Sequence, residues 1–321
     1  MLLKPSFKIT IGSETYDPGS QSPVELIIVN HSIDIPASSF LVKFGINDTT
    51  SKIKQGEDVE IQIGYEDDLK DVFSGIVDNI VPEMTRINVK GLNHATKLLE
   101  QRMNQIYESV SAGDIVQDLA NSGGISPDTC SSGLDFPVYV IDDRKNTWDH
   151  IKELALNCGF DAYLTHENKL VFKNYEKDTT HTVEYGINII EIEAREDRPM
   201  IEGVSVLGES PSSFKGADTS HWVTKKAVEG VEGEKSNLLV ESAVIRDKDT
   251  AAKMAKALMD TYARTLSGTV KIIGVADIRL NDTVEVKSVP NEMFNGEFQI
   301  RSVEHVMSKT RGYTTTLGWR K

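Results

Sequence analysis

One stretch of the sequence, residues 56–77, decides the class of fold: GEDVEIQIGYEDDLKDVFSGIV. It opens with a turn that contains Gly56 and acidic side chains. Apolar residues then alternate with polar ones over residues 59–65, and a second apolar run contains Phe73-Ser74-Gly75. Alternation with a period of two is typical of antiparallel strands that bury one face. This stretch therefore predicts an antiparallel pair of strands.

The rest of residues 1–100 continues this pattern. Turn sequences at 17–20 and 54–57 separate alternating runs, whose apolar members are Phe7, Ile9 and Ile11, then Phe40, Val42 and Phe44, and finally Ile87 and Val89. Several short strands of this kind close most simply into a barrel or a sandwich. We therefore expect a first β domain over residues 1–100.

Residues 101–176 have a different character and predict a small α/β module. Ser111 followed by Asp114 has the form of a helix-capping box. A second helix is expected from Asn146 or Thr147 to Gly159, because its apolar residues recur at spacings of three and four. Residues 160–165 and 169–173 then predict a hairpin around residues 167–168.

The third region, residues 177–321, returns to alternating strands and is expected to form a second β domain. One helix is predicted inside it, over residues 249–265, with Asp249 as its cap. The polar, glycine-containing stretches 208–220 and 230–236 are expected to be mobile loops that become ordered against a partner. The expected fold class is thus mainly β, with two antiparallel β domains that are barrels or sandwiches, an intervening α/β module and one helix associated with the second β domain.

An internal repeat links the two β regions. Residues 53–61 match residues 278–286, each with a turn, an acidic residue and an alternating strand. Each match is followed by a Phe-x-Gly sequence, at Phe73 and at Phe294. The sequence therefore predicts a duplicated β unit with Phe73 and Phe294 at equivalent buried positions. A chain with two such units can place six of them in a ring by using only three copies.

Composition excludes several classes of function. The formal net charge is -14, and such a surface disfavours stable binding to nucleic acid, which depends on Lys and Arg. The two cysteines, Cys130 and Cys158, are too few for a disulfide framework or a cysteine-based zinc site. No signal peptide or membrane-spanning stretch is recognisable, so folding in the cytoplasm without membrane insertion is expected.

The sequence provides no catalytic, cofactor-binding or metal-binding motif. The histidines have no short metal-ligand spacing; they are His31, His94, His150, His166, His181, His221 and His305. The adjacent acids at 67–68 and 142–143 do not show that two carboxylates face one substrate. Ser212 and Lys215 fit the Ser-x-x-Lys pattern of some acyltransferases, but its partner motifs are absent. We therefore expect a protein that is not an enzyme.

Taken in order, five segments resemble one known family. They are residues 56–77, 111–120, 148–159 with 170–172, 251–258, and 294–298 with 303–305 and 312–315. This set is similar to the phage late control protein D family, which is related to the hub of contractile phage baseplates. It is also related to the hub head of valine-glycine repeat protein G in type VI secretion.

The resemblance implies a structural baseplate hub. In such a hub, a homotrimer carries two tube-like barrels per subunit and forms a pseudo-sixfold ring between the hexameric tail tube and the trimeric spike. Because the sequence stops at Lys321, after the second β region, a separate spike protein is expected. The other partners implied are the tail tube protein, the tape-measure protein and further baseplate components. The final location would be a virion tail or an injection particle.

Two other functions remain open on the sequence alone. One is a tail tube or adaptor protein with the same barrel, and the other is a cell-wall hydrolase or glycan-binding tip protein. Phage tail, bacteriocin particle and secretion apparatus are not distinguished. If a ring forms, a net negative channel wall would let a nucleic acid pass without binding. The candidate wall residues are Glu57, Glu60, Glu285 and Glu297.

Overall fold

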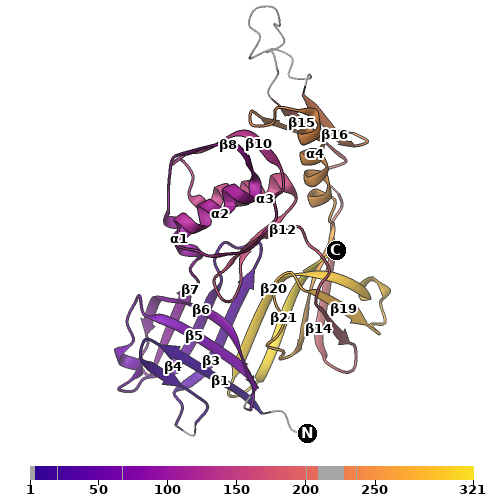
Figure 1. The fold of residues 1–321 in the computed structure, drawn as a ribbon. Coiled ribbons are helices and arrows are strands. Elements are labelled where there is room, and N and C mark those ends of the chain that lie inside the picture. Colours follow the sequence, from indigo (N-terminus) through magenta and orange to yellow (C-terminus); the bar gives the residue numbers. More distant parts are fainter. Residues whose placement is uncertain (1–3, 20, 67, 200, 209–227, 236) are drawn as a thin grey trace, which may run out of the picture.

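The structure is a computed structural model that describes residues 4–19, 21–66, 68–199, 201–208, 228–235 and 237–321. The chain is mainly β. Its largest element is one sheet of 13 strands that contains strands from both ends of the chain. In the described part of the chain this sheet is open, and it has two separate apolar cores. Figure 1 shows the two halves of this sheet at the base of the molecule.

The first β unit comprises β1 (Pro5–Ile11), β2 (Glu14–Tyr16), β3 (Val24–Ser32), β4 (Ser39–Gly45), β5 (Asp58–Tyr65), β6 (Asp68–Pro82) and β7 (Arg86–Leu92). Its apolar side chains alternate inward as the sequence predicts. Ile61 and Ile63 of β5 are fully buried, and Phe73 of β6 packs edge-on against Phe40 at 5.1 Å between ring centroids. These residues belong to one core cluster of this unit.

The second β unit comprises β13 (Thr180–Glu184), β14 (Ile189–Glu196), β18 (Leu266–Ile273), β19 (Thr283–Lys287), β20 (Gly296–Ser308) and β21 (Gly312–Arg320). Its own core contains Val284, Val286 and Leu317. Phe298 packs on Trp319 there, with ring centroids 4.1 Å apart.

The two β units repeat one pairing pattern. The strand order is β1-β5-β6-β7-β4-β3 in the first unit and β13-β19-β20-β21-β18-β14 in the second. Taken in chain order, the strands of the second unit occupy the places of β1, β3, β4, β5, β6 and β7. One pair differs, since β13 runs parallel to β19 whereas β1 runs antiparallel to β5. The predicted internal repeat is therefore confirmed.

The residue-by-residue register repeats as well. The β3–β4 ladder has a bulge between Val24 and Leu26, and the equivalent β14–β18 ladder has one between Ile189 and Glu191. The β6–β7 ladder has a bulge between Val77 and Asn79, and the equivalent β20–β21 ladder has one between Ile300 and Ser302. A bulge changes the pairing count at one defined point, so coincident bulges fix the correspondence between the units. Val303 corresponds to Ile80, and Val29 corresponds to Ala194.

This register shows that the expected equivalence of Phe73 and Phe294 is wrong. Phe73 corresponds to Gly296, and the buried aromatic of the second unit is Phe298. Phe294 ends the 3-10 helix η6 (Glu292–Phe294) and is half-buried. The reason is local: the Asn295 side chain bonds both the N–H and the C=O of Val289, so strand β20 begins only after this closed turn.

The α/β module contains α1 (Ala95–Glu100), β8 (Gln105–Ser111), α2 (Ala112–Ser122), β9 (Pro127–Cys130), β10 (Asp135–Ile141), α3 (Thr147–Cys158), β11 (Asp161–Leu164) and β12 (Leu170–Lys173). The predicted cap of α2 is confirmed, because the Ser111 hydroxyl accepts from the Asp114 N–H at 3.2 Å. Helix α3 begins at Asn146 as N-cap and ends at Gly159, whose φ of 69° is left-handed. Both predicted helices and the hairpin of this module are present.

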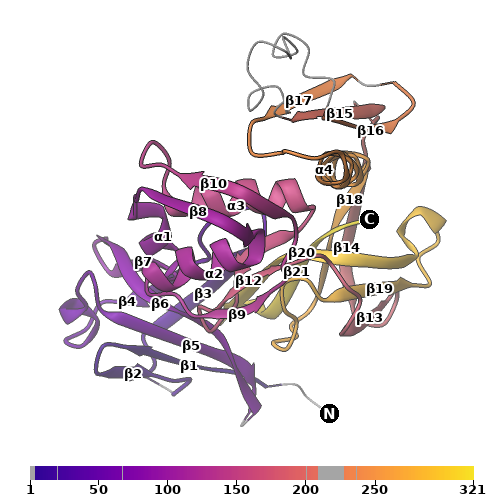
Figure 2. The ribbon, with the colours of Figure 1, turned by 45° about the horizontal axis from the view of Figure 1, so that its top comes forward.

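The predicted helix of the third region is α4 (Lys248–Tyr262), but its surroundings differ from the expectation. Its buried residues, including Met254 and Leu258, share a core with α3 and with a small sheet of β15 (Gly203–Gly208), β16 (Glu229–Gly233) and β17 (Leu238–Ser242). Helix α4 is thus part of the module's core and not of the second β core. Figure 2 shows α4 against this small sheet.

Two local predictions in this region are also corrected. The helix cap is Asp247, whose carboxylate accepts from the Thr250 N–H at 2.8 Å, and not Asp249. Residues 230–233, expected in a loop, lie in β16, where they pair with β15. Residues 209–220 of the other predicted loop lie outside the described residues, as do Ser212, Lys215 and His221.

Candidate assembly interface

The two β units of one chain are joined edge to edge. Residues 302–308 of β20 pair antiparallel with residues 26–32 of β3, which makes one continuous sheet of the two units. The first half of the same edge of β20 pairs with β19. One half of the long strand β20 therefore pairs within the second β unit, and the other half pairs with the first β unit.

The equivalent two edges remain unpaired in the described part of the chain. β6 corresponds to β20; residues 68–76 pair with β5, while the same edge of residues 79–82 has no strand beside it. β14 corresponds to β3 and pairs only with β18. Unpaired strand edges present free N–H and C=O groups that another chain can bind. Among the described residues, the molecule thus has one β3–β20 junction, and the strands that correspond to its two sides each keep a free edge.

Apolar side chains are exposed beside both free edges. Val81 and Met84, at the end of β6 and in the turn after it, are 42% and 97% exposed. Ile187 and Ile190, before and within β14, are 69% and 55% exposed. Each free edge thus has two exposed apolar side chains near it, which a partner strand would cover.

The α/β module is fixed at the junction of the two units by buried charges. Arg301 lies in the β20 bulge and forms ion pairs with Asp34, which follows β3, and with Asp161, the first residue of β11. Burial alone would raise the pKa of Asp161, but the Arg301 guanidinium outweighs it and the pKa is lowered. Asn168, in the β11–β12 turn, donates to the Ser74 carbonyl at 3.1 Å.

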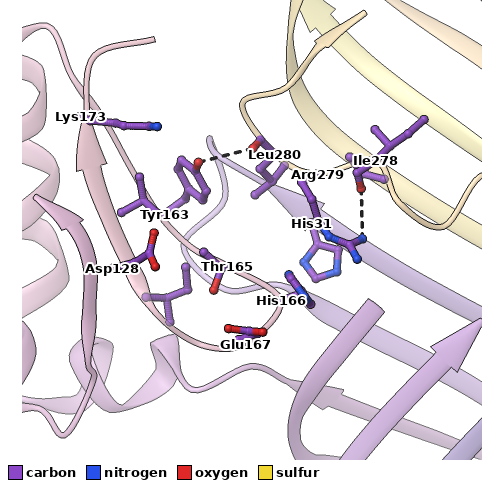
Figure 3. Close-up of a pocket in the computed structure, with 13 residues that line it drawn as sticks. His31, Asp128, Tyr163, Thr165, His166, Glu167, Lys173, Ile278, Arg279 and Leu280 are labelled. Carbon is purple, nitrogen blue, oxygen red and sulfur yellow. Dashed lines mark hydrogen bonds between the residues drawn. The ribbon is translucent and has the colours of Figure 1, made fainter. Parts of the chain in front are cut away.

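A cavity of about 280 Å³ lies between this hairpin and the junction, as the close-up in Figure 3 shows. His31 and Arg279 face His166 and Tyr163 across it. The Tyr163 hydroxyl donates to the Leu280 carbonyl at 3.4 Å. The lining thus comes from both β units and from the module.

The titratable groups of this cavity are held by structural bonds. Both ring nitrogens of His31 are engaged, by the Ser38 hydroxyl at 2.9 Å and the Val72 carbonyl at 2.7 Å. Burial lowers the pKa of His31 to about 4, so this imidazole is neutral at pH 7. Arg279 donates to the backbone carbonyls of Ala276 and Asp71. The arrangement provides rigid contacts between parts of the fold, and the Ser38 hydroxyl beside His31 is itself buried at 5% exposure.

Other side chains singled out by the sequence have structural surroundings. His305 is 1% exposed, and the hydroxyls of Tyr313 and Thr315 lie 2.9 and 3.2 Å from its Nδ1. Asp142 forms an ion pair with Arg144, which strongly lowers the pKa of Asp142. Within the described ranges, no group of three or more His, Cys, Asp or Glu side chains could hold a metal ion.

Of the four glutamates expected to line a channel, Glu285 and Glu297 lie opposite each other on β19 and β20, whereas Glu57 and Glu60 belong to the first β unit. Glu60 and Glu285 alternate with core residues of β5 and β19, so they lie on the face opposite each core. Glu285 pairs with Lys287 at 2.9 Å, and Glu297 pairs with Lys177. Glu57 accepts from the Lys54 N–H at 3.1 Å. Lysines therefore offset part of the acidity at the second unit.

Two important strands were not predicted from the sequence. They are β3, which pairs with β20 at the junction, and β14, which has a free edge. β14 reads IIEIEARE, and its alternation of apolar and acidic residues was a usable signal for a strand. The Arg301 ion pairs had no such signal, because Asp34 and Asp161 are far from Arg301 in sequence.

Solved structures with this fold are known. The chain is similar to the 43 kDa tail protein of prophage MuSo2 from Shewanella oneidensis, with a TM-score of 0.75 and 16% identity over 98% of each chain. It is similar to the tail protein of Neisseria meningitidis MC58, with a TM-score of 0.73 and 15% identity over 99% of this chain and 97% of that one.

A third solved structure connects the fold with secretion. This is the E. coli c3393 protein, described as a component of the type VI secretion system with structural similarity to the T4 bacteriophage tail proteins gp27 and gp5. The TM-score is 0.60 at 11% identity, over 97% of this chain and 76% of that one. The chain therefore shares its fold with these tail proteins and with the c3393 protein, in agreement with the fold that the sequence resemblance implied.

A family model described as the Alg8 N-terminal domain matches residues 38–309, and the chain belongs to that family. No curated protein matches the sequence. None of the helices in the described ranges combines the length and the apolar character that crossing a membrane requires.

Proposed function

We propose that this chain is a structural hub subunit of a phage-tail-like baseplate, three copies of which form a ring of six β units. The observation that carries the proposal is the single completed junction, β3 with β20, beside the two unpaired halves of an equivalent junction. If β14 of one copy pairs with the end of β6 of the next, the junction between chains uses the same strand pairing as the β3–β20 junction within a chain. Three copies then close the sheet and remove both free edges.

The internal register supports one particular pairing for the proposed second junction. Val303 of β20 pairs with His31, and His305 pairs with Val29. By the correspondence of the bulges, Ile80 takes the place of Val303 and Glu196 takes the place of His31. Ile80 would therefore lie opposite Glu196 of the next copy, and Val81 opposite Arg195. Pro82, which has no N–H, falls opposite Ala194, so that pair contributes fewer hydrogen bonds. The exposed Val81 would be covered in the process.

The partners follow from the symmetry of such a ring. Its six similar units match a hexameric tail tube, and its three chains match a trimeric spike on a separate protein. The tape-measure protein and other baseplate components complete the proposed set. Each closed ring of units would be a tube-like barrel wall, and we expect a net negative channel because the chain carries a formal charge of -14. This role is assembly, and we propose no enzymatic activity.

Cysteine cross-linking tests the proposed junction. The Asp197 N–H donates to the carbonyl of Thr265, the residue before β18, at 2.9 Å, so by alternation the Arg195 N–H points to its β18 partner Ser267. Arg195 would then form a non-hydrogen-bonded pair with Val81, with Cα atoms about 4.5 Å apart, which suits a disulfide. The variant carrying Val81→Cys and Arg195→Cys should yield covalent trimers after oxidation, seen on a non-reducing gel.

A register control accompanies this variant. Val81→Cys combined with Glu191→Cys places the second thiol four residues away on the same side of β14, and it should cross-link poorly. Each single variant measures the background from Cys130 and Cys158, which are half-buried. The proposal fails if the matched pair gives no interchain bond, or if the products continue in a ladder beyond three chains.

A further inference from the structure

A second cavity, of about 400 Å³, concentrates positive charge in this acidic chain. It lies between α3, the segment after α4 and the strands β20 and β21. Four basic side chains line it: Lys152, Arg264, Arg301 and Arg320. The acidic side chains around it are Asp34, Glu153 and Asp161. In a chain with a formal charge of -14, this local excess of cations requires an explanation.

The acidic side chains around this cavity already have ion-pair partners. Arg301 takes both Asp34 and Asp161 as ion-pair partners. The second oxygen of Asp161 accepts from the Gln299 amide at 2.6 Å. Glu153 pairs with Lys145, which does not line the cavity, at 2.5 Å. Within the described ranges, the carboxylates therefore leave the other three cations without an ion-pair partner.

Among the described residues, the hydrogen-bond acceptors that these three cations reach are all uncharged. Lys152 donates to the Ile33 carbonyl at 3.2 Å, and Arg264 reaches the Gln299 amide oxygen at 3.5 Å. The Nε of Arg320 is buried and has no hydrogen-bond partner among the described residues. Burial and the neighbouring charges of Arg301 and Arg264 lower the pKa of Arg320 to about 10, and burial lowers the pKa of Lys152. Arg320 is thus charged at pH 7 and has no ion-pair partner among the described residues.

We propose that this cavity binds an oxyanion, held by Arg320, Arg264 and Lys152. Guanidinium groups present paired N–H donors that match the oxygens of phosphate and carboxylate groups, and such charge-assisted bonds are the strong ones. A bound oxyanion would neutralise the excess charge and supply an acceptor for the Arg320 Nε. The source is either a free phosphate compound or an acidic side chain of a neighbouring protein, and the two share this chemistry.

Ligand-induced thermal shifts and calorimetry on the purified full chain test the site. The probes are inorganic phosphate, pyrophosphate and glutarate, each titrated at constant ionic strength. At least one probe should raise the melting temperature, because a ligand that binds only the folded state stabilises it. Arg320→Gln should weaken that binding at least tenfold. Arg311→Gln, which removes the same charge from the exposed β20–β21 turn, should leave it unchanged.

A second readout separates a binding role from a structural one. Without ligand, Arg320→Gln should keep or raise the melting temperature, because it removes a buried charge that its neighbours repel. A merely structural arginine would lower it. Tighter binding of phosphate or pyrophosphate assigns the site to a free phosphate compound, and tighter binding of glutarate assigns it to an acidic side chain. The proposal is overturned if no probe binds, or if Arg320→Gln binds as well as the wild type.

Discussion

Phe73→Ala and Phe298→Ala should each lower the free energy of unfolding by about 3–5 kcal/mol, the cost of removing a buried aromatic ring and leaving a cavity. Both side chains are 2% exposed and lie in the two separate β cores. Phe73 also contacts Phe40, and Phe298 stacks near Trp319, so each loss includes an aromatic contact. Urea unfolding followed by circular dichroism measures both values.

Phe294→Ala is the matched control for this prediction. The Phe294 ring is half-buried at the edge of the second core, so its removal exposes little new surface, and the expected cost is about 1 kcal/mol. Equal costs for Phe294→Ala and Phe298→Ala would contradict the register derived from the bulges. They would restore the alignment of Phe294 with Phe73 that the sequence motif indicates.

Lowering the pH from 7.5 to 5 should destabilise the chain by about 4 kcal/mol, about 2 kcal/mol from each of two buried histidines. Burial lowers the pKa of His31 to about 4 and that of His305 to about 3, from an ordinary value of 6.5. The unfolded chain therefore binds protons between pH 6.5 and pH 4 that the folded chain does not. The contribution of these two histidines to the free energy of unfolding is fully present above about pH 6.5 and is lost as the pH decreases below it.

Urea unfolding at a series of pH values checks this effect. The window above pH 5 separates the histidines from Asp161, Glu167 and Glu285, whose pKa values are lowered and which lose their contribution only at more acidic pH. His305→Gln should remove about 2 kcal/mol of the pH dependence between 7.5 and 5. Burial also lowers the pKa of His94 and that of His166, which adds to the loss of stability in the same direction. A free energy of unfolding that stays constant over this range would show that these imidazoles are not buried in neutral form.

The oxyanion cavity and the proposed ring can be tested independently. Arg195 and Arg320 line one pocket, so the binding assays keep Arg195 and the cross-linking variants keep Arg320. Failure of the cross-link would leave the thermal shifts as they are. Conversely, absence of oxyanion binding would not change the geometry of the edges.

The sequence by itself determined the local structure of this protein. Alternation with a period of two predicted β1, β4, β5 and β7, because a strand that buries one face must place every second side chain in the core. Ser111 and Asn146 predicted the starts of α2 and α3, since their side chains bond N–H groups only a few residues away. The similarity of residues 53–61 and 278–286 also indicated the duplication.

Only the tertiary structure decided how these elements meet. The β3–β20 junction joins residues about 270 positions apart, and nothing local in either strand specifies the other as its partner. The apolar face of α4 fitted either core, and packing against α3 resolved the choice. The same holds for Arg301, whose two carboxylates come from distant segments. Pairings of this kind depend on chain closure and register, and these are properties of the complete fold.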